Sequence, residues 1–568
     1  MYSIRQRLTC LLGAGLLLAG GCATNRHTGR SPADAGNVLP ATPPGRAVLT
    51  PKADAYAHYA SGIVYDQRNQ PDQADQEYEQ AVAADPGNEQ LAVDLARRLM
   101  QRHEMDKAIE LLTRSTARRH ATGMVYGWLG FALDQSGKTN QAVVAYRTAV
   151  KRSPHMLLAY HGLARIDLQN KQPQEALKVL DAAARQPKAD AEFLVGLAQF
   201  LVATGQTKAL PDSETRPRVR ALLQRAANLK PTDPILLQRM ADAYKAIGEV
   251  ASATRLYQSL LDQQADANPA MIAALREQLF QLYFQSGQRD KAAAQLRELR
   301  NADPTNPRVH YLLGSVALED RRYADAAASF QQALALAPDL EPAYYNLAVA
   351  QISLHDPEAA LDTLSSARTR FKLNFLLEFY TGVAQAAEKQ FDEALKSYTS
   401  AELLAKAADP ARLDEVFYYQ LGMAQERTGA FDDAVKTFRK CMQMAPDDPE
   451  PLNYLGYMWA DRGVNLEEAR TLIEKAVKFK PDEPAYLDSL AWVLYKLKLP
   501  QAALEPMEKA VRLSEKAPDA TLFEHLGDIR AALGQWDAAR DAWRKSLALE
   551  PNDAIKKKLD AAPAGSKP

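Results

Sequence analysis

The sequence predicts an all-α solenoid built from stacked helical hairpins. The first observation is a column of alanines that recur at an interval of about 34 residues. The second is a large apolar residue four positions after each alanine, and the third is a proline that closes many of the units. The alanines are Ala74, Ala108, Ala142, Ala176, Ala253, Ala292, Ala326, Ala360, Ala394, Ala434, Ala469, Ala503 and Ala539. The large residues are Tyr78, Leu112, Tyr146, Leu180, Tyr257, Leu296, Phe330, Leu364, Tyr398, Phe438, Ile473, Met507 and Trp543.

Each unit reads as two antiparallel helices, a first helix A and a second helix B. Helix A carries a small residue where helix B crosses it, and this residue is glycine in six units: Gly62, Gly130, Gly314, Gly422, Gly456 and Gly527. On helix B the alanine allows close approach, and the large residue one turn later fills the space above it. Proline then ends helix B, because it blocks continuation of the helix. The closing prolines are Pro86, Pro154, Pro231, Pro304, Pro338, Pro446, Pro481 and Pro551.

This pattern resembles the tetratricopeptide repeat (TPR) over residues 55–553. The resemblance implies a right-handed superhelix, in which stacking buries the apolar face that one hairpin cannot bury alone. We expect about fourteen units, the fifth of them enlarged (191–233) by a polar insertion, and a short cap and disordered tail at 554–568. The units are expected to begin near Ala55, Glu89, Gly123, Leu157, Ala191, Pro234, Ala273, Pro307, Glu341, Phe375, Glu415, Pro449, Pro484 and Ala520.

The N-terminus has the pattern of an export signal. Arg5 and Arg7 precede an apolar stretch, residues 8–19, that is too short to span a bilayer. Small residues then lead to Cys22, so residues 1–21 resemble a bacterial lipoprotein signal and Cys22 the lipid attachment site. Residues 23–54 are rich in Pro, Gly, Ser, Thr and Ala, which predicts a flexible linker. With the lipid that the resemblance implies on Cys22, residues 22–54 would form the lipid anchor and linker. The alternative is an ordinary secretory signal that is cleaved near Cys22.

The composition excludes several classes of function. The chain has 69 Lys and Arg against 70 Asp and Glu, so it is not a globally basic nucleic-acid binder, and three cysteines exclude a disulfide framework. Residues 132–139 loosely match a phosphate-binding loop but fall in the turn between two helices, not after a strand. The histidines form no metal-binding pair, and Cys441 stands in a column of small core residues. We therefore expect no enzyme activity, no metal, no cofactor and no small-molecule substrate.

Units twelve and thirteen add a finer resemblance. Residues 453–463 and 484–492 are similar to the C-terminal part of large TPR lipoproteins of Gram-negative bacteria. One such group consists of outer-membrane adaptors that bind a carboxyl-terminal processing protease and deliver cell-wall hydrolases to it. The resemblance implies a non-enzymatic scaffold, anchored in the outer membrane and facing the periplasm. The alternative is a structural lipoprotein of an envelope machine for polysaccharide export, pilus assembly or cell-wall synthesis.

Two surfaces are candidates for partner binding. The fifth positions of helix A in units eight to eleven are aromatic, and two further aromatics lie one turn along the same face. They predict a peptide groove made of Tyr311, Tyr345, Phe379, Tyr419, Tyr457 and Trp492. The alternative is that some of these rings belong to the core, since Tyr345 and Tyr419 each follow another tyrosine.

The second candidate is the basic density of unit two. Its members are Arg97, Arg98, Arg102, Arg114, Arg118 and Arg119. They form either a contact surface for an acidic partner or membrane headgroups, or a solvated helix face.

Overall fold

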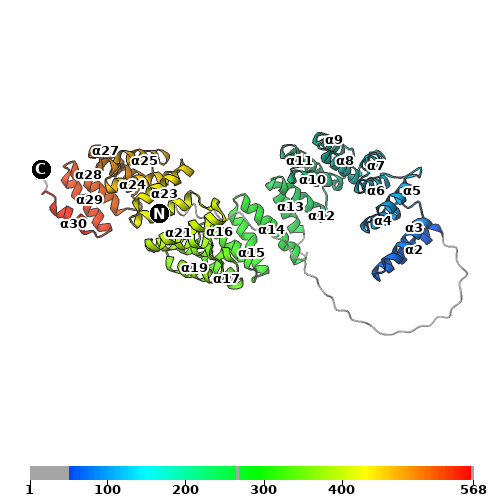
Figure 1. Ribbon diagram of the computed structural model, residues 1–568, viewed down its shortest axis with the longest axis horizontal. Coiled ribbons are helices and arrows are strands. Elements are labelled where there is room, and N and C mark those ends of the chain that lie inside the picture. Colours follow the sequence, from blue (N-terminus) through cyan, green and yellow to red (C-terminus); the bar gives the residue numbers. More distant parts are fainter. Residues whose placement is uncertain (1–49, 264–267, 564–568) are drawn as a thin grey trace, which may run out of the picture. The chain divides into compact units, whose positions relative to one another are not determined.

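The computed structural model describes residues 50–263 and 268–563, and within them all regular elements are helices (Figure 1). The expected lipoprotein signal, Cys22 and most of the linker lie outside the described residues. Within each of the two compact units of the chain, consecutive helices pack as hairpins, and neighbouring hairpins pack on one another. The described chain falls into two compact units, an N-terminal unit up to residue 295 and a C-terminal unit from residue 296, with the boundary inside α15 (Arg289–Ala302).

The N-terminal unit begins with the hairpin of α2 and α3. Its helices before α15 are α2 (Pro51–Gln67), α3 (Pro71–Ala84), α4 (Glu89–Gln101), α5 (Met105–Thr116), α6 (Gly123–Gln135), α7 (Thr139–Arg152), α8 (Leu157–Gln169), α9 (Pro173–Ala184), α10 (Ala191–Gln206), α11 (Asp212–Asn228), α12 (Pro234–Ala246), α13 (Val250–Gln263) and α14 (Pro269–Gln285). The polar insertion of the fifth hairpin supplies the turn before α11 and the first residues of that helix.

The C-terminal unit continues the same alternation of helices A and B. It contains α16 (Pro307–Glu319), α17 (Tyr323–Leu336), α18 (Glu341–Ser353), α19 (Pro357–Arg370), α20 (Phe375–Ala387), α21 (Phe391–Ala408), the 3-10 helix η2 (Pro410–Arg412), α22 (Glu415–Arg427), α23 (Phe431–Met444), α24 (Pro449–Arg462), α25 (Leu466–Phe479), α26 (Pro484–Lys496), α27 (Pro500–Leu513), α28 (Ala520–Ala532), α29 (Trp536–Leu549) and α30 (Asp553–Ala561). Helix α30 packs on the last hairpin through Ile555, which is 2% exposed.

The starts of the A helices follow the sequence pattern, except in α2 and α14. These two helices begin four residues earlier than expected, at Pro51 and Pro269. In both, a side chain caps the new start: Thr50 accepts a hydrogen bond from the backbone of Ala53, and Asn268 accepts one from Ala270. A capping residue followed by proline is a strong helix start, and it extends both helices by one turn.

The contact between small and large residues recurs inside the hairpins. All thirteen alanines of the column are fully buried. A Cβ added to Gly314 would lie 2.7 Å from the ring of Phe330, and one added to Gly422 would lie 2.9 Å from Phe438. Gly382, which the sequence analysis missed, has the same relation to Tyr398, at 2.7 Å. These positions are therefore small because an aromatic ring already occupies the space that a side chain would need.

The turns between helices A and B share a second constraint. Each of the fourteen turns contains a residue in the left-handed region, with φ between 56° and 82°. Six of these residues are glycine, and the others include lysine, arginine, histidine and asparagine. The residues are Asn69, His103, Gly137, Lys171, Lys208, Gly248, Gly287, Arg321, His355, Lys389, Gly429, Gly463, Lys498 and Gly534. The tight turn thus imposes a backbone conformation that non-glycine residues adopt at a cost of about 1–2 kcal/mol.

The small-to-large contact yields a stability prediction. Gly314→Val places two methyl groups against the buried ring of Phe330, so we expect the free energy of unfolding to fall by at least about 2 kcal/mol. Urea unfolding of the full chain, followed by circular dichroism, measures the change. The matched control is Ala328→Val on the exposed face of α17, where only helix propensity changes, by less than about 0.7 kcal/mol. Equal midpoints for the two variants would contradict the packing argument.

Candidate interaction surfaces

The expected aromatic groove is only partly available at the surface. Tyr345 and Phe379 are 2% exposed and Trp492 is 8% exposed, so all three are core residues. For these three the expectation of an exposed peptide contact is corrected. Tyr311, Tyr419 and Tyr457 are half-buried and still offer part of their rings to solvent. The ladder of six rings therefore reduces to three separated tyrosines, whose role in binding stays a prediction.

Tyr345 and Phe379 are buried because the helices beside them supply partners. The hydroxyl of Tyr345 donates a hydrogen bond to Glu341 at 2.5 Å, and its ring stacks on Tyr380 with centroids 5.9 Å apart. Phe379 lies parallel to Phe375, with ring centroids 5.5 Å apart and 9° between the planes. Burial and the carboxylate of Glu341 raise the pKa of Tyr345. Phe375 also lies near Phe417 of α22, so these rings stabilise the junctions between the hairpins that begin with α18, α20 and α22.

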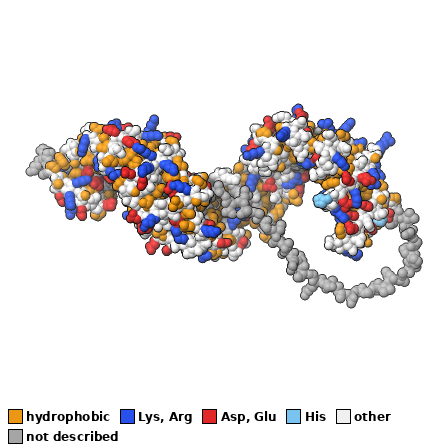
Figure 2. All heavy atoms as spheres, in the orientation of Figure 1, with side chains coloured by type: hydrophobic (Ala, Val, Ile, Leu, Met, Phe, Trp, Pro, Cys, Tyr) orange, Lys and Arg blue, Asp and Glu red, His pale blue; other side chains and the backbone are white. Residues whose placement is uncertain are grey.

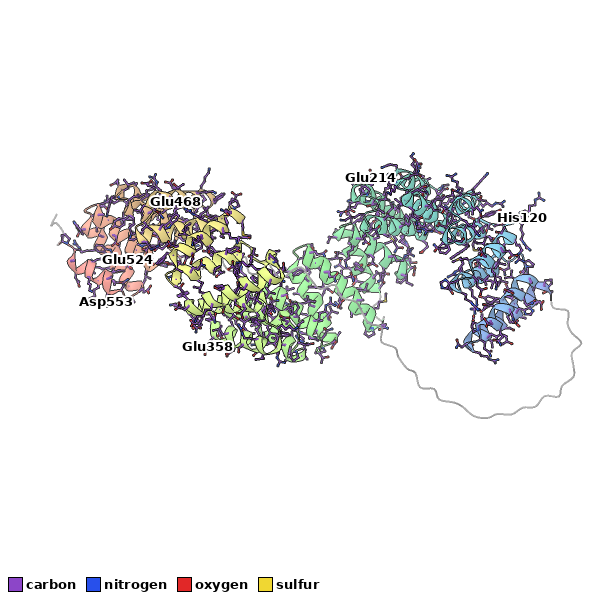
Figure 3. All side chains as sticks on the ribbon, in the orientation of Figure 1. His120, Glu214, Glu358, Glu468, Glu524 and Asp553 are labelled. Carbon is purple, nitrogen blue, oxygen red and sulfur yellow. The ribbon has the colours of Figure 1, made fainter. Side chains whose placement is uncertain are left out.

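Trp492 is covered by a histidine from the next hairpin. The imidazole of His525 (α28) lies 3.9 Å from the indole centroid at an angle of 15°, and its Nδ1 is 2.8 Å from a carboxylate oxygen of Asp488. His525 is 5% exposed. The neighbouring Glu524, labelled on α28 in Figure 3, forms an ion pair with Lys558 of α30 at 3.0 Å. The stack and the hydrogen bond of His525 join α28 to α26 of the preceding hairpin, and the ion pair joins α30 to α28.

The basic cluster of unit two is largely neutralised within the protein. Arg98 binds Asp66 through two nitrogens, at 2.6 and 2.8 Å, and also contacts Asp75. Arg102 contacts the same Asp75 and pairs with Asp72 at 2.8 Å. Arg98 and Arg102 therefore join the second hairpin to the first, and the expectation that they are free contact charges is corrected. Their partners lie about one repeat earlier in the chain.

The other four arginines of the basic cluster have different surroundings. Arg114 pairs with Glu110 on its own helix at 3.3 Å, and Arg97 lies over the indole of Trp128 at 5.2 Å. Arg118 and Arg119 are exposed in the turn after α5. The neighbouring His120 marks this turn at the periphery of the N-terminal unit in Figure 3. On the face shown in Figure 2, positive and negative side chains are interspersed on both units.

A hollow of about 250 Å³ opens between the first and second hairpins. Its lining is Tyr59, Tyr78, Leu91, Asp94, Leu95, Arg97, Arg98 and Gln101. The two leucines are buried, and the two tyrosine rings lie 5.3 Å apart. Tyr78 is the large residue of the first hairpin, and it is half-buried whereas its counterparts in the other hairpins are buried. The hollow is thus a place where the packing between hairpins is incomplete, and the sequence pattern did not indicate it.

The remaining sequence motifs occupy structural positions. Gly137 has a φ of 76° in the turn between α6 and α7, and Lys138 pairs with Asp106 at 3.3 Å. The thiol of buried Cys441 donates a hydrogen bond to the carbonyl of Glu415 at 3.2 Å. Among the described residues, no group of three or more His, Cys, Asp or Glu is placed to hold a metal ion. Over the same residues, no helix has the length and apolar content to cross a membrane.

The tetratricopeptide-repeat family matches several stretches of this chain. The matched residues are 67–123, 135–194, 278–341, 317–372 and 416–448. Together with the helical hairpins described above, these matches establish an all-α TPR solenoid. A fold of this kind generally serves as a scaffold for protein–protein interaction.

Two relatives match parts of the sequence. A TPR repeat-containing protein of Pseudomonas aeruginosa is 27% identical over 238 residues, which cover 39% of this chain and 36% of the relative. Cellulose synthase 1 operon protein C of Komagataeibacter xylinus is 26% identical over 282 residues, which cover 47% of this chain and 20% of the relative. The chain therefore spans about a third and a fifth of the lengths of these two relatives.

Two solved structures are similar to this chain. The Cut9–Hcn1 hetero-tetramer of the APC/C aligns over 89% of this chain and 95% of its own, with 15% identity and a TM-score of 0.39. MamA from Desulfovibrio magneticus RS-1 aligns over 30% of this chain and 94% of its own, with 20% identity and a TM-score of 0.28.

The ion pairs of Arg98 predict a local stability effect. Arg98→Ala leaves Asp66 without a guanidinium partner and leaves Asp75 with Arg102 alone, so we expect the first hairpin to lose about 2 kcal/mol of stability. Hydrogen exchange of α2 and α3 in the full chain measures this loss. In the control, Arg114→Ala removes an exposed pair within one helix and changes exchange by less than about 0.5 kcal/mol. Unchanged protection of α2 and α3 in Arg98→Ala would show that the pairs contribute little.

His161 predicts a pH dependence in the N-terminal unit. Its ring stacks on Phe200 with centroids 4.5 Å apart, and burial lowers the pKa of His161 to about 4. Between about pH 6.5 and 4 the unfolded state binds more protons than the folded state, so stability falls as the pH falls through this window. We expect His161→Gln to lack this loss, which amounts to up to about 2 kcal/mol at pH 5. Unfolding of the full chain at pH 7 and pH 5 measures it.

The exposed His120 provides the control for this prediction. His120→Gln should retain the acid sensitivity of the unaltered chain, because this exposed side chain takes no part in the stack of His161 on Phe200. Equal acid sensitivity of His161→Gln and His120→Gln would contradict the assignment to His161.

Proposed function

We propose that the protein is a non-catalytic, lipid-anchored scaffold of the bacterial cell envelope, and that it brings a periplasmic processing protease together with its substrates. The observation that carries the proposal is that hairpins of the TPR type fill the chain from residue 51 to residue 549. Such an array offers long surfaces on which other proteins can bind. The lipoprotein-like pattern before Cys22 supports an outer-membrane anchor with the body in the periplasm.

The mechanism we propose is an increase in effective concentration. Two proteins held on one solenoid meet as if each were present at millimolar concentration, whereas free molecules meet at their bulk concentrations. A carboxyl-terminal processing protease and a cell-wall hydrolase would therefore react faster on the scaffold, without any group of the scaffold entering the chemistry. The half-buried Tyr311, Tyr419 and Tyr457 are candidate contacts for an extended client segment.

A second candidate is a structural component of an envelope machine. The match to cellulose synthase 1 operon protein C, over 47% of this chain, favours a complex that makes or exports polysaccharide. Affinity purification of the full chain from its native cells, with identification of the bound proteins, distinguishes the two roles. A processing protease together with a hydrolase supports the adaptor, and glycan synthase or export components support the machine. An enzyme activity of the purified chain itself would contradict both.

The anchor can be tested separately from partner binding. Cys22→Ala removes the lipid attachment site, so we expect the protein to move from the outer-membrane fraction to the soluble periplasmic fraction and still bind its partners. Its fold resides in contacts between hairpins and not in the lipid. The matched control is Cys441→Ala, which removes a buried thiol and should leave the protein in the membrane fraction. Retention of Cys22→Ala in the membrane after a salt wash would show that the anchor is wrong or incomplete.

A further inference from the structure

We propose that the hollow between hairpins one and two binds a segment of a partner protein that carries an aromatic residue next to an aspartate or glutamate. The inference rests on the proposed scaffold role and specifies one of its contact sites. The hollow lies between α2, α3 and α4 and has a volume of about 250 Å³. This volume suits one large side chain and is small for a whole domain or a drug-sized ligand.

The lining of the hollow favours an aromatic side chain. Leu91 and Leu95 are 7% and 4% exposed and supply apolar surface. The rings of Tyr59 and Tyr78 line the hollow, with centroids 5.3 Å apart and an angle of 55° between the planes. An aromatic ring packs well against such a pair, and it brings large contact area at a low cost in conformational entropy.

The charges around the hollow favour a carboxylate beside that ring. Arg98 is already engaged by Asp66 and Asp75, and its guanidinium lies 5.2 Å from the ring of Tyr78. Arg97 is exposed, lies over Trp128, and has no carboxylate partner among the described residues. Its guanidinium therefore keeps donors that can bind a carboxylate in a two-pronged manner.

The polar groups beside Arg97 suit the backbone of an extended segment. Asp94 accepts a hydrogen bond from Gln90 at 3.0 Å and retains further acceptor positions for a backbone N–H. Gln101 is exposed at the edge of the hollow and can both donate and accept. Ile63 lies one turn after Tyr59 on α2, is 41% exposed and adds apolar surface to the first hairpin. A peptide segment whose aromatic ring occupies the hollow can therefore extend beyond it in both directions, so the bound segment can be internal to its chain and need not be a terminus.

Selection of peptides on the full chain tests the inference. Random dodecapeptides displayed on phage are selected on the unaltered protein, and the enriched sequences are synthesised with a fluorophore for anisotropy measurements. We expect an aromatic residue adjacent to Asp or Glu in the enriched sequences. We also expect affinity to fall at least about tenfold in Arg97→Glu and to recover in part in Arg97→Lys. Arg119→Glu reverses another exposed charge of the same unit and should change affinity less than threefold.

The outcomes separate this inference from the scaffold proposal. Sequences without the paired ring and carboxylate, equal affinity for Arg97→Glu, or no enriched sequence at all would each overturn the inference. The inference would also be overturned if every enriched peptide bound through its C-terminal carboxylate, because the ligand would then be a chain terminus. Thermal unfolding of Arg97→Glu checks that the variant folds, and Arg97→Lys repeats the test if it does not. Purification of native partners judges the scaffold role independently of these results.

Discussion

The close contact between a small residue on helix A and a large residue on helix B is the constraint on which the structure depends. Where Gly314 faces Phe330 or Gly422 faces Phe438, no room remains for a Cβ. The contact fixes how near the two helices of a hairpin approach, and hence which faces remain for the next hairpin. A single hairpin leaves those faces apolar and exposed, so neighbouring hairpins stack to bury them. The buried alanine beside each large residue serves the same close approach.

This dependence explains why the sequence predicts the hairpins so well. A constraint repeated every 34 residues or so leaves a column of small residues that is visible without a structure. Helices α2 and α14 begin four residues earlier than the repeat pattern predicts, at Pro51 and Pro269. Capping by Thr50 and Asn268 stabilises these earlier starts. The left-handed turn residues, such as Lys171, gave no signal, because most of them are not glycine. Backbone geometry there is imposed by the hairpin and not by the residue.

The candidate surfaces were harder to predict, because exposure depends on neighbours from other repeats. Helix A of an interior hairpin is enclosed by the helix B before it, by its own helix B and by the helices A on both sides. Residues 343–351 of α18 are therefore all buried. Adjacent tyrosines such as Tyr344 and Tyr345 are therefore both core residues. In the same way, the sequence shows Arg98 as a charge but does not show Asp66 and Asp75 beside it. Sites for partners are better sought where packing between hairpins is incomplete, as at the hollow beside Tyr78.

The central claim is that hairpin contacts, repeated along the chain, hold the solenoid and leave its edges less stable than its interior. Hydrogen exchange of the full chain, resolved helix by helix, tests this most directly. The account predicts the strongest protection in α18 and α20, where unbroken runs of residues are buried. It predicts the weakest protection at the two edges, in α2, where only Ala55 and Gly62 are buried, and in α30, where only Ile555 is. Exchange in α18 and α20 as fast as in α2 would contradict it.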